Sequence, residues 1–73
     1  SPMSEMAPPK ESDLGKKVSI RLHDPAGGFR DLLGILVAVN QVEKKDGSVH
    51  TFIPEEIAIW KVVPTDTTMR RKN

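Results

Sequence analysis

Polar and apolar side chains alternate strictly along residues 17–22. A period of two is the pattern of a β-strand that buries one face and exposes the other. The apolar face of this segment consists of Val18, Ile20 and Leu22. The pattern therefore predicts a half-buried strand.

Residues 29–39 form a longer apolar segment with Gly34 near its middle. They follow residues 23–28, in which a proline and two glycines predict a loop. A helix is one interpretation, because leucine and alanine favour helices and Asp31 would act as a cap. The central glycine, the β-branched residues and the lack of a polar face at helical spacing favour a strand instead. We therefore expect a strand in which Gly34 marks a sharp bend or a bulge.

Asp46 and Gly47 separate residues 42–45 from residues 49–53, and we expect a short strand on each side. Asp-Gly is a preferred pair for a hairpin turn, because both central positions tolerate positive φ. The sequence therefore predicts a β-hairpin with a charged, solvated tip.

Residues 54–57 begin with a proline and two glutamates, which suit a single 3₁₀ turn. A last strand is predicted over residues 58–63, and Pro64 ends it. Five short strands in about 50 residues indicate an all-β fold, an SH3-like five-stranded small barrel. Its expected core contains Val18, Ile20, Leu22, Leu33, Ile35, Val37, Val39, Val49, Ile53, Ile57, and either Ile59 or Trp60.

The two ends of the chain lack this periodicity. Residues 1–13 contain three prolines and almost no large apolar groups, which predicts a disordered leader. Residues 65–73 are predicted to be a disordered basic tail or linker, with Arg70, Arg71 and Lys72 near its end. The barrel is therefore expected to span residues 14–64.

Composition and charge exclude several classes of protein. The chain has 73 residues, and eleven Lys and Arg against ten Asp and Glu leave a net charge of +1. This balance differs from the basic footprint of a dedicated nucleic-acid binder. The longest apolar run, residues 32–39, is far shorter than the roughly 20 residues of a membrane-spanning helix. Because the chain also has no cysteine and no export signal, we expect a cytoplasmic protein without membrane association.

Residue types that serve in catalysis or metal binding are present, but their spacing suits neither task. His23 and His50 are far apart and no carboxylate cluster accompanies them, so we expect no metal site. Asp46 and Ser48 lie close to His50, yet an aspartate and a serine beside Gly47 are what a turn requires. No glycine-rich phosphate loop is present. We therefore expect a non-catalytic chain without a cofactor.

The surface offers bases and aromatic side chains. Lys17 and Arg21 project from the outward face of the first strand, and Arg30 lies across the loop. Strand-face bases can follow a phosphate backbone when aromatic residues are interleaved to stack bases. The chain's aromatic residues are Phe29, Phe52 and Trp60, and three in a small barrel are more often part of the core.

Trp60 has two interpretations. Ile57, Ile59 and Lys61 lie on one face of the last predicted strand, and Trp60 lies on the other. If Lys61 points to solvent, Trp60 lies inside the barrel. If the isoleucines are inside, Trp60 is exposed on an apolar patch of the kind that marks a partner surface.

Four motifs carry a family resemblance: G-K-K-V-S-I-R-L at residues 15–22, G-G-F-R-D-L-L-G at 27–34, K-K-D-G-S-V at 44–49 and I-A-I-W-K-V-V-P at 57–64. Together they resemble the SH3-like barrel that precedes the catalytic domain in some actinobacterial GNAT-type acetyltransferases. The resemblance implies an accessory module without catalytic residues, encoded separately or belonging to a longer chain. Its expected ligand is a protein partner or the catalytic domain itself, with nucleic acid as a further alternative. The expected binding surface is Phe29, Arg30 and Asp31 with Trp60.

Residues 15–22, with the Ile-Pro of residues 53–54 and the Val-Pro of residues 63–64, are also similar to the C-terminal barrel of bacterial ribosome maturation factors. That resemblance implies contact with ribosomal RNA or protein through Lys17, Arg21 and Arg30. The chain lacks the domain that precedes the barrel in that family, and the Phe-Arg-Asp motif and Trp60 fit it less well. The acetyltransferase-associated module is therefore the favoured expectation.

Overall fold

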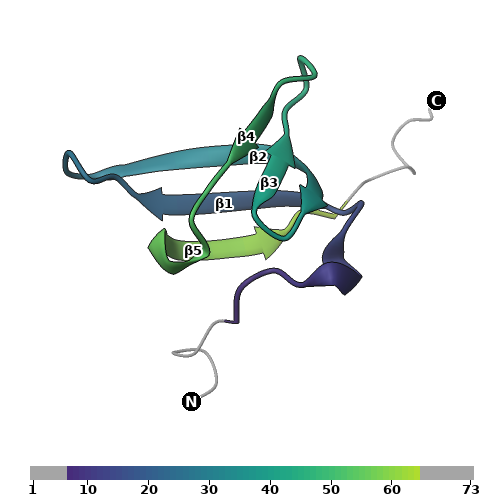
Figure 1. Cartoon of the computed structure of the whole chain (residues 1–73), viewed down its shortest axis with the longest axis horizontal. Coiled ribbons are helices and arrows are strands. Elements are labelled where there is room, and N and C mark those ends of the chain that lie inside the picture. Colours follow the sequence, from purple (N-terminus) through teal and green to yellow (C-terminus); the bar gives the residue numbers. More distant parts are fainter. Residues whose placement is uncertain (1–6, 65–73) are drawn as a thin grey trace.

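Five strands form at the five segments whose patterns predict strands (Figure 1). The structure, a computed structural model, describes residues 7–64. In chain order the elements are η2 (Glu11–Asp13), β1 (Lys17–His23), β2 (Phe29–Ala38), β3 (Gln41–Glu43), β4 (Val49–Thr51), η3 (Pro54–Glu56) and β5 (Ile57–Val62). All strand pairs are antiparallel, so the predicted five-stranded all-β fold is confirmed.

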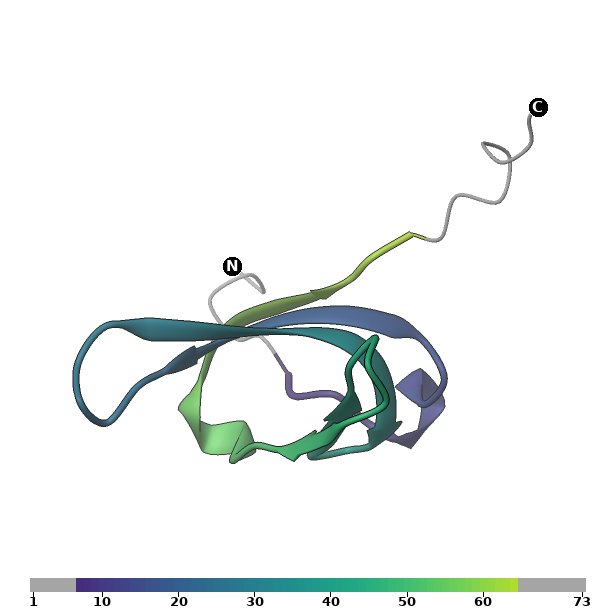
Figure 2. The same cartoon turned by 90° about the horizontal axis from the view of Figure 1, so that it is seen from above.

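The strands form one sheet in the order β4-β3-β2-β1-β5, so the last strand returns to pair with the first. The edge strands are therefore β4 and β5, and η3 carries the chain from one edge to the other. Figure 2 shows that the sheet curls, with η3 and β4 lying across the interior from β1 and β2. The ladders within residues 7–64 do not pair β4 with β5, so full closure of the barrel stays a prediction.

The core takes the predicted face of β1 but the other face of β2. Val18, Ile20 and Leu22 are fully buried, as the alternation predicts. In β2, Leu32 and Leu36 are buried, because the register sets Leu32 opposite Ile20 and opposed residues share a face. The residues of this segment that were predicted in the core are exposed instead: Leu33, Ile35, Val37 and Val39.

The rest of the core comes from the second half of the chain. Val42 of β3 and Phe52, just after β4, are buried, whereas the predicted core residues Val49 and Ile53 are exposed. Ile57 and Trp60 are half-buried and pack against the core, and Ile59 is exposed. The sequence left open whether Ile59 or Trp60 faces the core, and Trp60 is the one that does.

Gly34 is required by a close approach of two strands. A Cβ at this position would lie against the carbonyl oxygen of Glu43 and 2.8 Å from Cγ1 of Val42. Gly34 itself pairs regularly with Val18, and the irregularity in the β2–β3 ladder falls between Leu36 and Ala38. The prediction of a bulge at Gly34 is therefore wrong in position, although the need for glycine there is real.

The hairpin predicted at Asp46 and Gly47 forms between β3 and β4. The Lys44 N–H donates to the Ser48 carbonyl over 2.7 Å, and the Gly47 N–H donates to the Lys44 carbonyl over 2.8 Å. Of Asp46 and Gly47, only the glycine has a positive φ, at 89°. The predicted hairpin is thus confirmed, and its loop is the three-residue type in which the glycine takes the left-handed conformation.

Part of the segment predicted to be a disordered leader packs on the sheet. η2 lies within residues 1–13 and is a second 3₁₀ turn beside the one predicted. Asp13 is buried, and its carboxylate accepts hydrogen bonds from the Lys10 N–H at 3.0 Å and from Nζ of Lys16 at 3.4 Å. The Gly15 N–H donates to the Leu36 carbonyl over 2.8 Å, which ties this segment to β2. The predicted tail, residues 65–73, lies outside the described residues.

We expect Gly34→Ala to lower the free energy of unfolding by about 1–3 kcal/mol, because the added methyl group forces β2 and β3 apart. Chemical denaturation measures the change. Gly47→Asn is the control, since nothing lies within 4 Å of a Cβ there and asparagine tolerates positive φ. A Gly34→Ala variant as stable as the wild type would contradict the packing described.

The environment of Asp13 predicts a pH-dependent contribution to stability. The hydrogen bond from the Lys10 N–H, followed by that from Lys16, holds the pKa of Asp13 below its ordinary 3.8. A lowered folded-state pKa stabilises the fold above the ordinary value, and this contribution is lost as pH falls through the folded-state pKa. Asp13→Asn should therefore be less stable than the wild type at pH 7, with a smaller difference at pH 3. Denaturation at both pH values tests this, with exposed Glu11→Gln as the control expected to show neither effect.

Candidate interaction surfaces

One face of β1, β2 and β5 points away from the core, and we call it the outer face. Its residues oppose one another across the ladders and alternate with the buried residues. They are Lys17, Ser19, Arg21, Phe29, Asp31, Leu33, Ile35, Ile59 and Lys61. Phe29, Leu33 and Ile59 are 57%, 51% and 55% exposed. The outer face therefore combines large apolar side chains with interspersed charges.

Arg21 is the most engaged charged residue of the outer face. Its Nε lies 2.9 Å from Oδ1 of Asp31 and its Nη2 lies 3.2 Å from Oδ2, a two-point contact. These hydrogen bonds lower the pKa of Asp31 and raise the pKa of Arg21. The guanidinium carbon also lies 5.7 Å from the centre of the Phe29 ring, which in turn lies 5.2 Å from the His23 ring. The charge of Arg21 is therefore compensated within the chain.

The four residues of the expected binding surface are only partly brought together. Phe29 and Asp31 lie on the outer face, and Asp31 and Trp60 both line a hollow of about 340 Å³. Arg30 is opposite Leu22, so it lies on the other face of the sheet from Phe29 and Asp31. Asp31 thus shares the outer face with Phe29 and a hollow with Trp60, whereas Arg30 is separate from them.

The bases of the alternative nucleic-acid surface do not form a continuous patch. Lys17 and Arg21 share the outer face with Ser19 between them, whereas Arg30 is on the opposite face. Of these bases, Arg21 is already bonded to Asp31. A groove of bases that tracks a phosphate backbone is therefore not formed by this set.

A second hollow of about 520 Å³ lies where the outer face meets β3. Leu33 and Ile35 supply its apolar wall. Its charged rim is formed by Lys17, Glu43, Lys44 and Lys45. This hollow was not predicted, because Leu33 and Ile35 were expected in the core.

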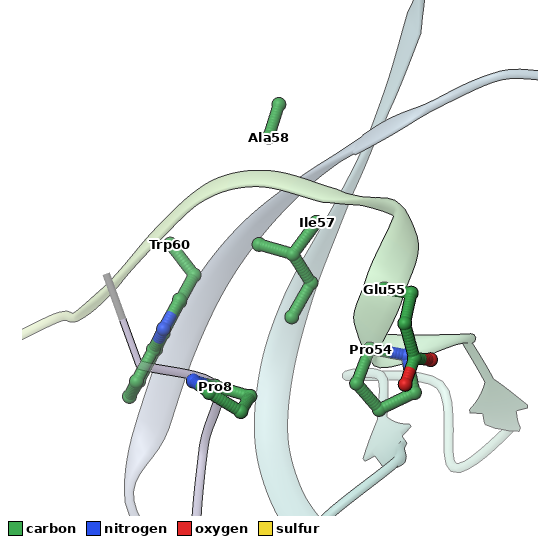
Figure 3. A pocket seen from close by; sticks show the side chains of 6 residues that line it. All are labelled: Pro8, Pro54, Glu55, Ile57, Ala58 and Trp60. Carbon is green, nitrogen blue, oxygen red and sulfur yellow. The ribbon is translucent and has the colours of Figure 1, made fainter. Parts of the chain in front are cut away.

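A third surface surrounds Trp60 on the side of the N-terminal segment (Figure 3). Nε1 of Trp60 donates a hydrogen bond of 2.8 Å to the carbonyl of Ala7. A groove of about 220 Å³ is lined there by Pro8, Pro54, Glu55, Ile57, Ala58 and Trp60. No sequence pattern indicates this contact, since it joins residues 53 positions apart.

The hairpin brings Asp46, Ser48 and His50 together, but in the wrong order for a catalytic triad. The Ser48 hydroxyl donates to Oδ1 of Asp46 over 2.6 Å, and Nε2 of His50 lies 3.0 Å from the same hydroxyl oxygen. Because the hydroxyl proton goes to Asp46, Nε2 of His50 acts as donor and not as the base of Ser48. The same carboxylate accepts the Ser48 N–H, and the side-chain bond lowers the pKa of Asp46. The cluster therefore stabilises the turn.

Within residues 7–64, no three His, Cys, Asp or Glu side chains gather where they could hold a metal ion. Within the same residues, no helix has the length and apolar character needed to cross a membrane.

Comparisons with protein-family models, with curated proteins and with solved structures find no significant match.

The geometry of the hairpin cluster predicts that Ser48 is not a nucleophile. We expect the wild type and Ser48→Ala to hydrolyse p-nitrophenyl acetate at the same rate, with His50→Ala reporting any contribution of the free imidazole. A rate that falls at least tenfold in Ser48→Ala, with the fold retained by circular dichroism, would contradict this account of the cluster.

Proposed function

We propose that this chain is a non-catalytic interaction domain of the small-barrel type that docks on a protein partner through its outer face. The observation that carries the proposal is the double-sided apolar character of β2. Leu32 and Leu36 are buried, while Leu33, Ile35 and Val37 on the other side are exposed. Strands that are apolar on both sides are typical of sheets covered on both faces.

The exposed apolar side chains and the hollows of the outer face support a protein ligand. Large exposed apolar patches are rare on monomeric soluble proteins. Where they occur, they commonly mark a surface that binds a partner. The two hollows, of about 340 and 520 Å³, give the large side chains of a partner places to enter.

The charges on this face also favour protein over nucleic acid. Arg21 is already paired with Asp31, and the apolar wall of the larger hollow is formed by Leu33 and Ile35. Binding of nucleic acid gains most of its free energy from bases that are available to phosphates. A face whose arginine is already paired with a carboxylate and whose largest exposed side chains are apolar is better suited to a protein surface.

The identity of the partner rests on the family resemblance. We propose that the partner is the catalytic domain of an actinobacterial GNAT-type acetyltransferase, encoded in the same or a neighbouring reading frame. In that arrangement the barrel contributes no catalytic residue and holds no cofactor. A cytoplasmic location is part of the same proposal and is supported by the cysteine-free composition.

The test is to produce the acetyltransferase domain encoded with this chain and to measure its binding to the chain by calorimetry. Leu33→Glu should weaken binding at least tenfold, because it places a charge among the apolar groups of the interface. Ile53→Glu is the matched control, since Ile53 is similarly exposed, at 53%, but lies outside the outer face. Binding by the control should equal that of the wild type.

Two results would overturn the proposal. One is the absence of any acetyltransferase domain in or beside the reading frame. The other is binding to RNA or DNA with an affinity that falls steeply with salt and a salt slope reduced by about one in Lys17→Ala, which indicates a phosphate contact. The latter outcome would assign the outer face to nucleic acid.

A further inference from the structure

The contact between Trp60 and the N-terminal segment has the chemistry of peptide recognition. An indole N–H donates to a backbone carbonyl, that of Ala7, and the Pro8 ring lies beside the indole ring (Figure 3). The hydrogen bond needs only a backbone carbonyl, which every peptide has. The contact with the indole ring needs only a proline, so neither interaction is peculiar to this segment. A segment of another chain with the same backbone shape satisfies the same groove.

The backbone shape is set by the two prolines. Each proline fixes its own φ near −65°, and a residue that precedes a proline is pushed toward the extended or polyproline II region. Ala7 and Pro8 both precede a proline. Lys10, which follows Pro9, is also extended, with φ −130° and ψ 176°. Such segments are preorganised, so little conformational entropy is lost when they bind to aromatic grooves.

The groove itself is built by β5 and η3. Trp60 and Ile57 come from β5, and Pro54 comes from the first position of η3. Figure 3 shows Ile57 and Pro54 facing the space beside Pro8. Glu55 is the charged residue among those that line the groove. At about 220 Å³ the groove is below the usual range for small-molecule sites, but it accommodates proline-sized groups.

We propose that the surface around Trp60 is a binding site for proline-containing extended peptides and that residues 7–9, whose Pro8 lines one side of the groove, cover part of that surface as an intramolecular ligand. The foreign ligand is a segment with two consecutive prolines, and Glu55 favours one that carries a basic residue beside them. The chain's own segment competes with it and sets the apparent affinity. This inference does not depend on the proposed function, because the groove uses the side of β5 that faces the core and the N-terminal segment.

Competition from residues 7–9 lowers the affinity that is measured for a foreign peptide. A site that is open for only a fraction of the time binds with an affinity reduced by that fraction. If residues 7–9 cover this surface for about nine-tenths of the time, releasing them tightens binding of a foreign peptide about tenfold. η2 and the Asp13 contacts anchor the segment further along, so the Pro8 contact can open without loss of that anchor.

The experiment uses the full chain labelled with ¹⁵N and follows the indole N–H resonance of Trp60, the chain's one tryptophan. The probes are a synthetic peptide of residues 5–13 and its counterpart carrying Pro8→Ala and Pro9→Ala. Two protein variants are compared with the wild type. Pro8→Gly removes an exposed ring that lines the groove, and Pro25→Gly makes the same change in the exposed loop between β1 and β2.

We expect Pro8→Gly to shift the indole resonance of the free protein and to bind the proline peptide about tenfold more tightly than the wild type. The substituted peptide should bind at least tenfold more weakly than the proline peptide. Pro25→Gly should behave as the wild type in both measurements.

Three results would overturn the inference: no binding of the proline peptide to Pro8→Gly, equal affinity for the two peptides, or equal affinity of wild type and Pro8→Gly for the proline peptide. If Pro8→Gly fails to fold, titration of the wild type decides the question. Excess proline peptide must then shift the indole resonance while the substituted peptide leaves it unchanged, and failure of either condition refutes the site.

Discussion

The register between β1 and β2 is the constraint on which the rest of the structure depends. It sets Ile20 opposite Leu32 and Val18 opposite Gly34. Because side chains alternate between the faces of a sheet, a shift by one residue would exchange every inward and outward side chain of β2. The observed register also puts Gly34 where β3 passes too close for any side chain. The curl of the sheet over its core and the apolar outer face therefore follow from the same pairing.

Much of the fold was predictable because its signals are local. The alternation of residues 17–22, the Asp-Gly turn and the proline that begins η3 each act over a few residues, and each element forms close to where it was expected. The inward face of β2 was not predictable from pattern, since residues 32–39 are apolar at both odd and even positions. Only the pairing with β1 selects one set, and pairing is not a local property. The bulge between Leu36 and Ala38 escaped prediction for the same reason.

The binding surfaces illustrate the same limit. Arg21 and Asp31 are ten residues apart in sequence and meet only because they are opposed in the ladder. Phe29, Arg30 and Asp31 are consecutive in sequence, which suggested a common surface. Because side chains alternate along a strand, Arg30 lies on the opposite face from the other two. The Ala7–Trp60 contact joins the two ends of the fold, and nothing in a proline-rich segment without periodicity indicates where it will pack. The sequence shows the chemical type of each side chain, but it does not show which residues that side chain contacts.

The position of the N-terminal segment also affects how the sheet ends. β4, at one edge, has three residues, which is short for a template on which another chain could pair, whereas β5, at the other edge, has six. The hydrogen bond from Trp60 holds Ala7 and the two prolines that follow it near the longer edge. Prolines have no N–H to donate, so this stretch of chain is a poor sixth strand and leaves less room for a foreign one. The residues that lie against Trp60 thus make the free edge of β5 a poorer template for pairing with a second chain.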